Sequence, residues 1–536
     1  SLATSSLTKA PSPRVWGLFF APCRLETRAA MCVFVLFELG FWYTDLRNFG
    51  CAALFMGESM IDRNIFRAYD IRGDVATQLT GDVAYSIGLA LGITHFEAGA
   101  RIGVGRDART SSPELSQRLI DGLVAQGIDV VDLGMITTPM SYYAMRCPNL
   151  GATPDIPSSA QPMAGSVMIT GSHNPDNENG LKICKGTSSF LRDDIVALYE
   201  AIANGTAREK GGNPGCVVAH DVSDAYCADI WNRLSVSRKL RIVVDAGNGV
   251  AGPIALRVLS HYANITPLYC DPDGRFPHHH PDPSVEANLA DCRAKVLETG
   301  ADLGIAFDGD GDRIGVVDAS GAIIAADRLL VLLARDALAI APHSTILGDV
   351  KCSKFTFDDI AKHGGTPCMT KTGHALIKAK IRETHAALAG EMSGHFFFNE
   401  NWYGFDDAVY TAARLCRIRS RSSRSIEEML ADLPPSCATP ELRLSCNDDA
   451  KFALSDAVCA YYSARYPTCA LDGARVDFPN GWALVRASNT QPVIVARVEG
   501  ASHDDTRAIC DDLARIIDEI ARGVGAQIDL TPLRKV

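Results

Sequence analysis

The sequence predicts an α/β protein with three similar mixed α/β domains and a C-terminal α+β domain. A strand, a loop and a helix follow one another three times, at separations of roughly 100–140 residues, as in repeated structural units. After Pro434-Pro435 the order changes to short strands and then one helix, which indicates a smaller α+β unit. At 536 residues, the chain is also too long for a single core.

The first strand–loop–helix unit is expected between residues 101 and 133. Arg101–Asp107 forms the predicted strand and the loop after it. Ser112 is predicted to cap the next helix and Pro113 to be its first residue, because a serine hydroxyl accepts from free N–H groups and proline lacks one. The helix is expected to end at Gly127, before a strand at Ile128–Leu133. Apolar residues at helical spacing predict its buried face: Leu115, Leu119, Ile120, Leu123 and Val124.

Two further units follow the same order. Arg241–Asp245 is a predicted strand that leads through Ala246–Gly249 into a helix ending near Leu259. Thr345–Val350 is the corresponding strand of the third unit, and its helix is expected near Phe357–His363. The pattern of elements recurs, although the residues themselves do not.

The C-terminal region differs from these units. A short helix at Ile426–Leu433 precedes the two prolines. Three strands are expected around residues 473–478, 482–487 and 493–499, followed by an amphipathic helix over Asp504–Ala521.

The first sixty residues do not fit the α/β pattern. An apolar run from Met31 to Tyr43 is interrupted by Glu38 and is shorter than the roughly 20 residues of a spanning helix. We expect residues 1–60 to be a poorly packed leader, with the true start near Met56 or Met60. A membrane-surface anchor and a cleaved signal peptide are the alternatives, and the second is disfavoured because no small-residue cleavage site follows cleanly.

Composition narrows the function classes. The chain has 47% hydrophobic and 21% charged residues, as ordinary globular proteins do. Its formal net charge of −11 argues against nucleic-acid binding, which needs a basic surface. The 17 cysteines show no paired C-x-x-C spacing, so neither a disulfide framework nor a zinc site is predicted and a reducing cytoplasm fits best. We expect a cytoplasmic monomer without stable membrane association.

Six residues, Thr170–Pro175, form the first candidate site. They follow the apolar run Ser166–Ile169, so a buried strand is expected to end in a loop that presents the Ser172 hydroxyl beside the His173 imidazole. This loop alone is compatible with acyl transfer as well as with phosphoryl transfer.

A second loop carries three aspartates, Asp308, Asp310 and Asp312, separated by glycines and followed by Arg313. The strand Leu303–Phe307 comes before it. Carboxylates packed this closely repel one another unless a cation lies among them, and magnesium prefers oxygen ligands. The loop therefore predicts a magnesium site. It does not match a calcium loop, because Arg313 and Ala319 stand where glycine and glutamate are required.

Two other stretches have competing interpretations. Gly247–Gly252 matches G-x-G-x-x-G, and Asp271 follows at the distance typical of a dinucleotide site, which would make the protein an NAD-dependent oxidoreductase. We favour a tight strand-to-helix turn. His278–His280 with Asp282 resembles a metal cluster, but the surrounding prolines favour a rigid connection.

Two later loops suit a phosphorylated sugar. Gly390–His395 mixes an acid, a hydroxyl and an imidazole, which suits hydrogen bonds to sugar hydroxyls. Arg486–Pro492 offers a guanidinium, hydroxyls and backbone N–H groups, as a phosphate cradle does. Either stretch alone is also compatible with an ordinary turn.

Together, Thr170–Pro175, Asp308–Arg313, Gly390–His395 and Arg486–Pro492 resemble the α-D-phosphohexomutase superfamily, and most closely its bacterial bifunctional phosphomannomutase/phosphoglucomutase branch. Phe66–Gly73 matches as well. The resemblance runs from about Ile65 to Ala521. It implies four domains around a central cleft, with expected boundaries at 61–222, 223–321, 322–434 and 435–536.

The resemblance also implies roles for single residues. Ser172 would be the phosphoserine, and would bind magnesium together with Asp308, Asp310 and Asp312. Arg72, His173, Lys182 and Arg313 would take part in catalysis. The substrate would be bound by Tyr69, Lys351, His374, Glu391, Ser393, His395, Arg486, Ser488, Asn489 and Thr490.

The implied reaction is reversible phosphoryl transfer between the 1- and 6-positions of glucose and mannose phosphates, through a hexose 1,6-bisphosphate that also serves as activator. Such products commonly feed nucleotide sugars. Glu391-Met392-Ser393 and Ser488-Asn489-Thr490 favour the mannose/glucose enzyme over a phosphoglucosamine mutase, which is the alternative.

Overall fold

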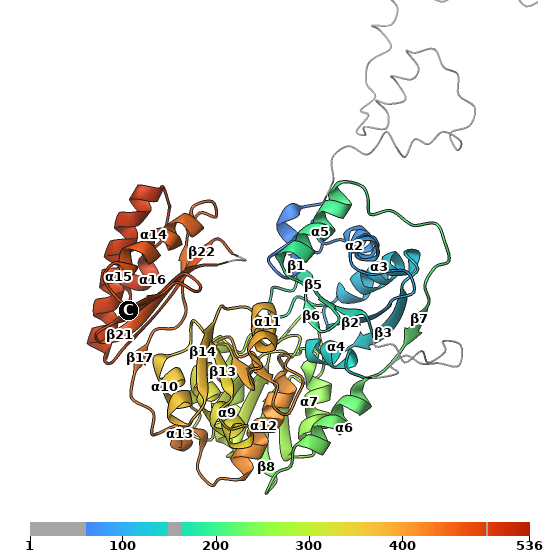
Figure 1. The fold of residues 1–536 in the computed structure, drawn as a ribbon. Helices are drawn as coiled ribbons and strands as arrows, with labels where there is room; N and C mark the ends of the chain where they lie inside the picture. Colours follow the sequence, from blue (N-terminus) through green and yellow to red (C-terminus); the bar gives the residue numbers. More distant parts are fainter. Residues whose placement is uncertain (1–60, 148–162, 489–490) are drawn as a thin grey trace, which may run out of the picture. The chain divides into compact units, whose positions relative to one another are not determined.

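The computed structural model describes residues 61–147, 163–488 and 491–536. The predicted leader 1–60, a surface excursion expected at Pro148–Pro162, and the site residues Asn489 and Thr490 lie outside these ranges. Four β-sheets and the helices around them make up the described part (Figure 1). Within it, no helix is both long and apolar enough to cross a bilayer.

The first sheet has the strand order β1-β5-β4-β2-β3-β7, with β6 beside β5. Its strands are β1 (Ile71–Asp74), β2 (Arg101–Arg106), β3 (Asp129–Met135), β4 (Gly165–Ile169), β5 (Glu178–Lys185), β6 (Ser188–Ser189) and β7 (Val217–Ala219). The helices of this region are η3 (Arg63–Ile65), α2 (Gly81–Thr94), α3 (Ser112–Ala125), α4 (Thr138–Ala144) and α5 (Arg192–Ala203).

Two glycines allow α2 and α3 to pack closely. A Cβ atom on Gly122 would lie 2.3 Å from the carbonyl oxygen of Tyr85, and one on Gly88 would lie 2.5 Å from that of Leu119. Neither position has room for a larger residue, so the pair sets the close contact between the two helices. Helix α3 begins at Ser112, close to the predicted position, but its N-cap is Ser111 and not Ser112. The Ser112 hydroxyl instead donates to Asp107 (2.5 Å).

The second sheet has the order β12-β11-β10-β8-β9. Its edge strand β12 extends beyond the predicted boundary at residue 321, because Gly321 takes a left-handed φ of 82° and turns the chain back onto β11. The elements are α6 (Ser223–Arg233), β8 (Leu240–Asp245), α7 (Ala251–Leu259), β9 (Ala263–Leu268), η4 (Glu286–Leu289), α8 (Ala290–Thr299), β10 (Leu303–Phe307), β11 (Ile314–Asp318) and β12 (Ile323–Ile324).

The third sheet has the order β14-β13-β15-β16. The arginine-rich stretch Arg417–Arg424 begins inside α12, where buried Arg417 and Arg414 both pair with Asp336. The elements are α9 (Ala326–Ile340), β13 (Thr345–Asp349), α10 (Lys354–Lys362), β14 (Thr366–Thr370), α11 (His374–Thr384), β15 (Leu388–Gly390), β16 (Phe396–Phe398), α12 (Ala408–Ser420) and α13 (Ile426–Met429).

One topology recurs in these three sheets, which confirms the predicted repeat. In each, two parallel strands joined by a helix lie beside a third parallel strand, and the third strand forms an antiparallel hairpin with the next. The quartets are β3-β2-β4-β5, β9-β8-β10-β11 and β14-β13-β15-β16. The connecting helices are α3, α7 and α10. The three hairpin loops, β4–β5, β10–β11 and β15–β16, are therefore equivalent positions in the repeat.

The fourth sheet is antiparallel, with the order β17-β22-β21-β20-β19, and β18 pairs with β22 along the same edge as β17. Helices α14 and α15 pack on it (Figure 1). Helix α14 was not predicted and lies between the strands, so the order is not simply strands and then a helix. The elements are β17 (Cys437–Ala438), β18 (Leu442–Ser445), α14 (Lys451–Ser463), β19 (Thr468–Cys469), β20 (Ala474–Phe478), β21 (Gly481–Ala487), β22 (Val493–Gly500), α15 (His503–Val524) and α16 (Thr531–Arg534).

Candidate active site

The three equivalent hairpin loops carry three of the four sequence motifs, and hydrogen bonds join them. Ser172, in the β4–β5 loop, donates from Oγ to Asp308 Oδ2 in the β10–β11 loop at 2.8 Å. Arg313, at the end of that second loop, donates from Nε to His395 Nε2 in the β15–β16 loop at 3.0 Å. The predicted serine, aspartate and sugar-binding motifs therefore form one site.

A buried arginine holds the serine loop in a strained shape. Ser172 has a left-handed φ of 49°, which costs a non-glycine residue roughly 1–2 kcal/mol. Arg109 donates to the carbonyl oxygens of Ser172 and Glu178, both at 2.9 Å, and to two others in the loop. Gly171 is required here, because a Cβ would lie 2.5 Å from the Arg109 guanidinium. The sequence analysis did not identify Arg109.

The aspartate loop folds around one carboxylate. Asp308 Oδ1 accepts from the backbone N–H groups of Gly311, Asp312 and Arg313 at 3.0–3.1 Å. Gly309 lies against the serine loop, where a Cβ would be 2.3 Å from the Ser172 carbonyl oxygen. The glycines between the aspartates therefore let the metal loop approach the serine.

Lys182 provides positive charge at the centre of the cluster. Its Nζ lies 2.6 Å from Asp310 Oδ2 and 2.5 Å from Asp312 Oδ2. Burial alone would lower the pKa of Lys182, but the charges of the three aspartates outweigh burial and raise it. Lys182 is thus an ammonium ion at neutral pH. Thr138 Oγ1 also donates to Asp310 (2.5 Å) and was not predicted.

The three carboxylates fit a hard cation. One ligand oxygen from each of Asp308, Asp310 and Asp312 lies within 4.8 Å of the others. Asp310 Oδ1 and Asp312 Oδ1 are buried and have no hydrogen-bond partner among the described residues. Buried carboxylate oxygens without donors are costly, and an oxygen-seeking divalent cation would satisfy them.

His173 lies next to the nucleophile candidate. Its Nδ1 is 3.0 Å from Ser172 Oγ. Burial lowers the pKa of His173 well below its usual value, and the charges of Arg313, Arg72 and Lys182 lower it further. Arg72 is held near this loop by Asp70 (2.7 Å) and by Asn174 Oδ1 (3.1 Å).

The predicted sugar-binding residues gather around Glu391. This buried carboxylate accepts from the Gly373 N–H at 2.5 Å, and the Ser393 hydroxyl lies 3.4 Å from it. His374 follows Gly373, and its ring packs edge-on against Tyr69 with centroids 5.2 Å apart. The His374 and His395 rings are stacked, at 6.0 Å. Predicted residues from three separate stretches are thus brought together.

Asp406 supports this group, and the sequence analysis missed it. Its carboxylate is 3.1 Å from His395 Nδ1 and 3.2 Å from Lys378 Nζ, and all three side chains are buried. His395 Nε2 accepts from Arg313, so a neutral His395 has its N–H at Nδ1, which lies 3.1 Å from Asp406 Oδ2 and 3.5 Å from Asp312 Oδ1. Asp406 therefore provides a carboxylate beside that nitrogen.

Asp406→Asn is expected to destabilise the protein by about 3–5 kcal/mol, because it leaves the buried Lys378 ammonium without a charged partner. Thermal and denaturant unfolding measure this loss. Asp456→Asn, at an exposed position of α14, is the matched control and should leave the free energy of unfolding unchanged. Equal stability of the two variants would contradict the role given to Asp406.

Lys351 follows β13, and Arg486 lies on β21. Lys351 pairs with Glu441 at 3.1 Å. Arg486, at the end of β21, pairs with Asp472 at 3.0 Å. Asp472 in turn accepts from the Thr372 N–H at 3.2 Å, which ties the Arg486 strand to the loop that carries His374. Ser488 Oγ accepts from the Gln491 N–H in the same hairpin (3.2 Å).

Two other sequence features have structural roles. A Cβ on Gly252 would lie 2.0 Å from the Cys270 carbonyl oxygen, and one on Gly249 would lie 2.9 Å from that of Gly309. Close backbone packing therefore accounts for these glycines without a dinucleotide. Among the described residues, His278–His280 are not part of a metal-binding group. His279 instead pairs with Asp245 at 3.1 Å.

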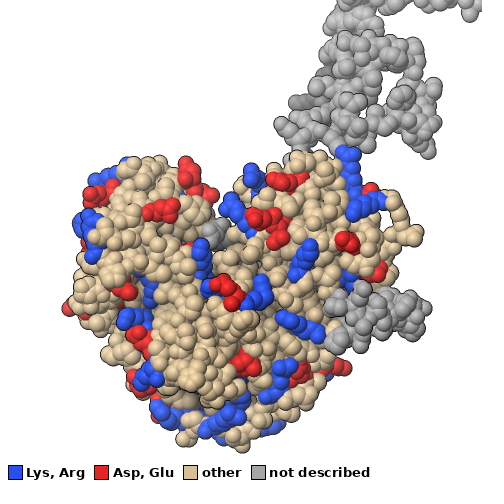
Figure 2. Space-filling view, in the orientation of Figure 1, with Lys and Arg blue, Asp and Glu red and all other residues tan. Residues whose placement is uncertain are grey.

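On the face shown in Figure 2, basic and acidic side chains are interspersed. The site differs from this surface, because its charges are buried. Its buried cations include Arg109, Lys182, Lys351, Lys378 and Arg486. Fixed charges in a water-poor setting interact more strongly than those on a surface.

Comparison with known proteins agrees with this arrangement. Family models of phosphoglucomutase/phosphomannomutase α/β/α domains I, II and III match residues 63–221, 224–321 and 325–437, and the C-terminal domain model matches 436–516. A phosphomannomutase/phosphoglucomutase of Pseudomonas aeruginosa is 44% identical over 83% of this chain and 94% of its own. A phosphoglucomutase of Neisseria gonorrhoeae is 42% identical over 84% and 94%.

Solved structures are similar as well. A phosphoglucomutase/phosphomannomutase family protein from Burkholderia thailandensis is 42% identical, with a TM-score of 0.80 over 87% of this chain and 99% of its own. A phosphomannomutase described as putative from Thermus thermophilus is 21% identical with a TM-score of 0.69, and shows the same fold. The four domain matches and the high identity over nearly whole relatives place this chain in the phosphoglucomutase/phosphomannomutase family.

Proposed function

We propose that this protein transfers a phosphoryl group reversibly between the 1- and 6-positions of glucose and mannose phosphates. The observation that carries the proposal is the 2.8 Å hydrogen bond from Ser172 Oγ to Asp308, within a cluster of three buried carboxylates. In a Ser-His-Asp hydrolase the histidine base is itself oriented by a carboxylate. Ser172 faces candidate metal ligands instead, which supports a phosphate carrier. The names of the similar proteins agree with this assignment.

In the proposed reaction, Ser172 carries a phosphoryl group and gives it to the free hydroxyl of a bound hexose phosphate. The P–O bond to Ser172 breaks while a P–O bond to the sugar oxygen forms, and the hydroxyl proton passes to a base. The resulting hexose 1,6-bisphosphate then rotates within the site, so that its other phosphate faces Ser172. That phosphate is transferred to Ser172 by the reverse step. Phosphoryl transfer leaves the protein mainly positioning and charge stabilisation to supply.

We assign magnesium to the aspartate cluster. Asp308, Asp310, Asp312 and the phosphate on Ser172 would hold it. The ion would neutralise negative charge on the phosphoryl oxygens. Magnesium takes oxygen ligands almost exclusively, and all three side chains offer oxygens.

Proton transfer and charge stabilisation fall to different residues. Lys182 is held as a cation by two aspartates, so it stabilises negative charge and is a poor base. The lowered pKa keeps His173 neutral, and its Nδ1 lies 3.0 Å from Ser172 Oγ. We therefore assign to His173 the proton that Ser172 loses when it receives a phosphoryl group. Arg72 and Arg313 add positive charge beside the transferred group.

The remaining residues are proposed to bind the substrate. The Glu391 carboxylate accepts hydrogen bonds from sugar hydroxyls, and the Ser393 hydroxyl donates to them and accepts from them. The phosphate that is not transferred lies on the hairpin after β21. The full proposed substrate set is Tyr69, Lys351, His374, Glu391, Ser393, His395, Arg486, Ser488, Asn489 and Thr490.

One coupled assay tests the function. Glucose, mannose and glucosamine 1-phosphates are supplied separately, each with and without a trace of the matching 1,6-bisphosphate. We expect 6-phosphates from glucose and mannose, and stimulation by the bisphosphate. Stoichiometric release of inorganic phosphate would instead indicate a phosphatase, and a preference for the glucosamine compound would favour the phosphoglucosamine mutase alternative.

Arg486→Gln is expected to raise KM for the hexose phosphate about 10–100-fold, because a charged hydrogen bond to phosphate contributes roughly 1.5–3 kcal/mol. The effect on kcat should be smaller, since this phosphate is not the one transferred. Steady-state kinetics with glucose 1-phosphate measure both constants. Arg507→Gln, on the exposed side of α15, is the control. An unchanged KM in Arg486→Gln would remove this residue from the substrate site.

A further inference from the structure

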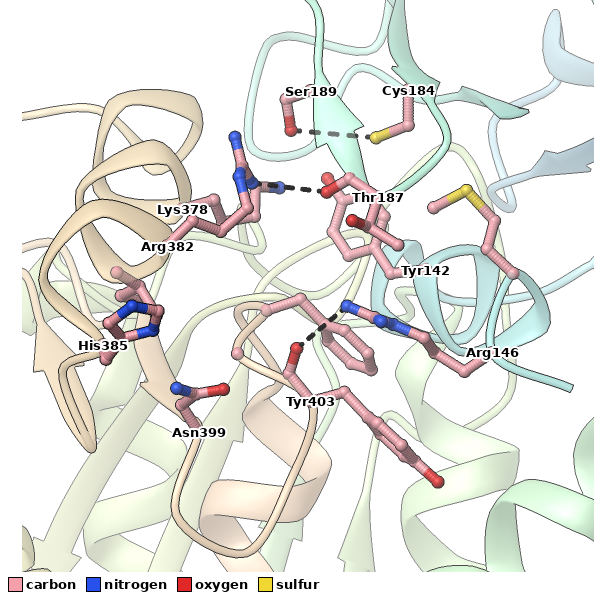
Figure 3. Close-up of a pocket in the computed structure, with 14 residues that line it drawn as sticks. Tyr142, Arg146, Cys184, Thr187, Ser189, Lys378, Arg382, His385, Asn399 and Tyr403 are labelled. Carbon is pink, nitrogen blue, oxygen red and sulfur yellow. Dashed lines mark hydrogen bonds between the residues drawn. The ribbon is translucent and has the colours of Figure 1, made fainter. Parts of the chain in front are cut away.

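A cavity of about 280 Å³ lies outside the reacting groups, between α4, the β5–β6 turn, α11 and the loop that follows β16 (Figure 3). Its volume corresponds to about nine water molecules at roughly 30 Å³ each. Basic side chains line it from two elements: Arg146 from the end of α4, and Lys378, Arg382 and His385 from α11 and its C-terminus. None of the lining residues is an aspartate or a glutamate.

The two guanidinium groups have no carboxylate partner in the part of the chain that the structure describes. Arg146 donates to the Tyr403 carbonyl oxygen and lies 5.9 Å from the Tyr403 ring centroid, and Arg382 donates to the Thr187 carbonyl oxygen, with both hydrogen bonds at 3.4 Å. Neither arginine forms an ion pair with a described residue. Burial and the positive charge of Arg382 lower the pKa of Arg146. Like charges repel, so an anion between the two groups would stabilise this arrangement.

The wall of the cavity also holds an unused hydrogen-bond donor. Tyr142 is 4% exposed, and its hydroxyl has no partner among the described residues. Burial raises the pKa of Tyr142 well above its usual value, so the hydroxyl keeps its proton. A buried hydroxyl without a partner is unfavourable, and an oxyanion within reach would satisfy it.

Lys378, which also lines the cavity, already has a charged partner. Lys378 Nζ lies 3.8 Å from the Tyr142 ring centroid and 3.2 Å from Asp406. Its charge is therefore already balanced by Asp406, whereas no carboxylate of the described ranges balances Arg146 or Arg382. The positive charge available to a ligand comes from the two arginines at the rim.

We propose that this cavity is a binding site for a small organic anion with a phosphate or carboxylate group, recognised by Arg146, Arg382 and Tyr142. A planar guanidinium fork suits both oxyanions. The hydroxyl of Thr187 and the amide of Asn399, which also line the cavity, suit a ligand with additional polar groups. The proposal does not depend on the function assigned to Ser172.

The test compares anion binding to three proteins. Arg146→Gln/Arg382→Gln removes both rim charges, and Arg293→Gln/Arg507→Gln removes two exposed charges elsewhere. Equilibrium dialysis at low ionic strength, where screening is weak, counts the orthophosphate or citrate bound per chain. For at least one probe, wild type and control should bind one equivalent more than the cavity variant. An additional equivalent of orthophosphate would indicate a phosphate ligand, and an additional equivalent of citrate would indicate a carboxylate ligand.

Equal numbers of bound equivalents in all three proteins, for both probes, would overturn the proposal. Anions that bind at the Ser172 site contribute equally to every protein, so they cancel in the comparison. Asn399→Asp is a second variant, which places a carboxylate in the cavity wall and should also lose the additional equivalent. Unchanged melting temperatures show that the variants fold, and retention of the equivalent in a folded Asn399→Asp would also count against the site.

Discussion

Ser172→Ala is expected to abolish multiple turnover. The variant lacks the oxygen that carries the phosphoryl group between the two steps. Loss of a covalent nucleophile costs on the order of 10⁴-fold or more in rate. The hydroxyl's hydrogen-bond partners are the side chains of Asp308 and His173, and the backbone bonds from Arg109 that hold the loop do not involve it, so the fold should survive its removal. The measurements are the rate of glucose 6-phosphate formation and the transfer of labelled phosphate from a hexose 1,6-bisphosphate to the protein.

Ser172→Gly separates this chemical effect from a structural one. The left-handed φ of 49° at this position destabilises the folded state when the residue is serine or alanine, but not when it is glycine. The glycine variant should therefore be about 1 kcal/mol more stable than the alanine variant and equally inactive. Ser188→Ala, at an exposed position on β6, is the control for activity. Normal turnover in either Ser172 variant would disprove the phosphoserine mechanism.

The paired substitution Asp308→Asn/Asp310→Asn is expected to abolish metal-dependent activity. It leaves one carboxylate, Asp312, in the cluster, and Lys182 already pairs with that group. One charged oxygen ligand does not hold magnesium against water, because the ion loses its hydration reluctantly. We expect no saturable activation by MgCl₂ and a loss in kcat of on the order of 10³-fold, as for removal of a group that stabilises transition-state charge.

Calorimetry with MgCl₂ distinguishes lost binding from lost catalysis in this variant. Asp271→Asn/Asp511→Asn removes the same charge from two exposed positions and should keep both the heat of binding and the activity. A metal response in the cluster variant that equals the wild-type response would show that the ion binds elsewhere.

The sequence predicted the parts of the site that depend on local pattern. The motifs around Ser172, Asp308 and Glu391 each follow a short buried strand, and each lies in a hairpin loop of one repeat. Their equivalence explains why they meet, but it depends on strand pairing that hydrophobic patterns do not specify. The repeat was therefore predictable as a pattern of elements, and the shared position of the three loops was not.

Arg109 and Asp406, which support the site, could not be predicted from the sequence for a physical reason. Arg109 is 63 residues from Ser172 in sequence, and its role depends on a turn that only the folded loop provides. Asp406 contacts His395 and Lys378 from the connection between β16 and α12, where it is paired with Phe397 by an isolated β-bridge. In the sequence, Arg109 and Asp406 are an ordinary arginine and aspartate. Helix α14 was missed because apolar residues on both sides of its sequence obscure the helical period.

The ion pairs of Lys182 have a consequence for how the protein acquires its metal. A tethered ammonium among three carboxylates is an intramolecular competitor, present at a fixed and high effective concentration. Any divalent cation must displace part of this pairing, so its apparent affinity is lower than three bare aspartates would give. The same pairing keeps the carboxylates together in the metal-free protein. Metal exchange can then proceed without unfolding the loop.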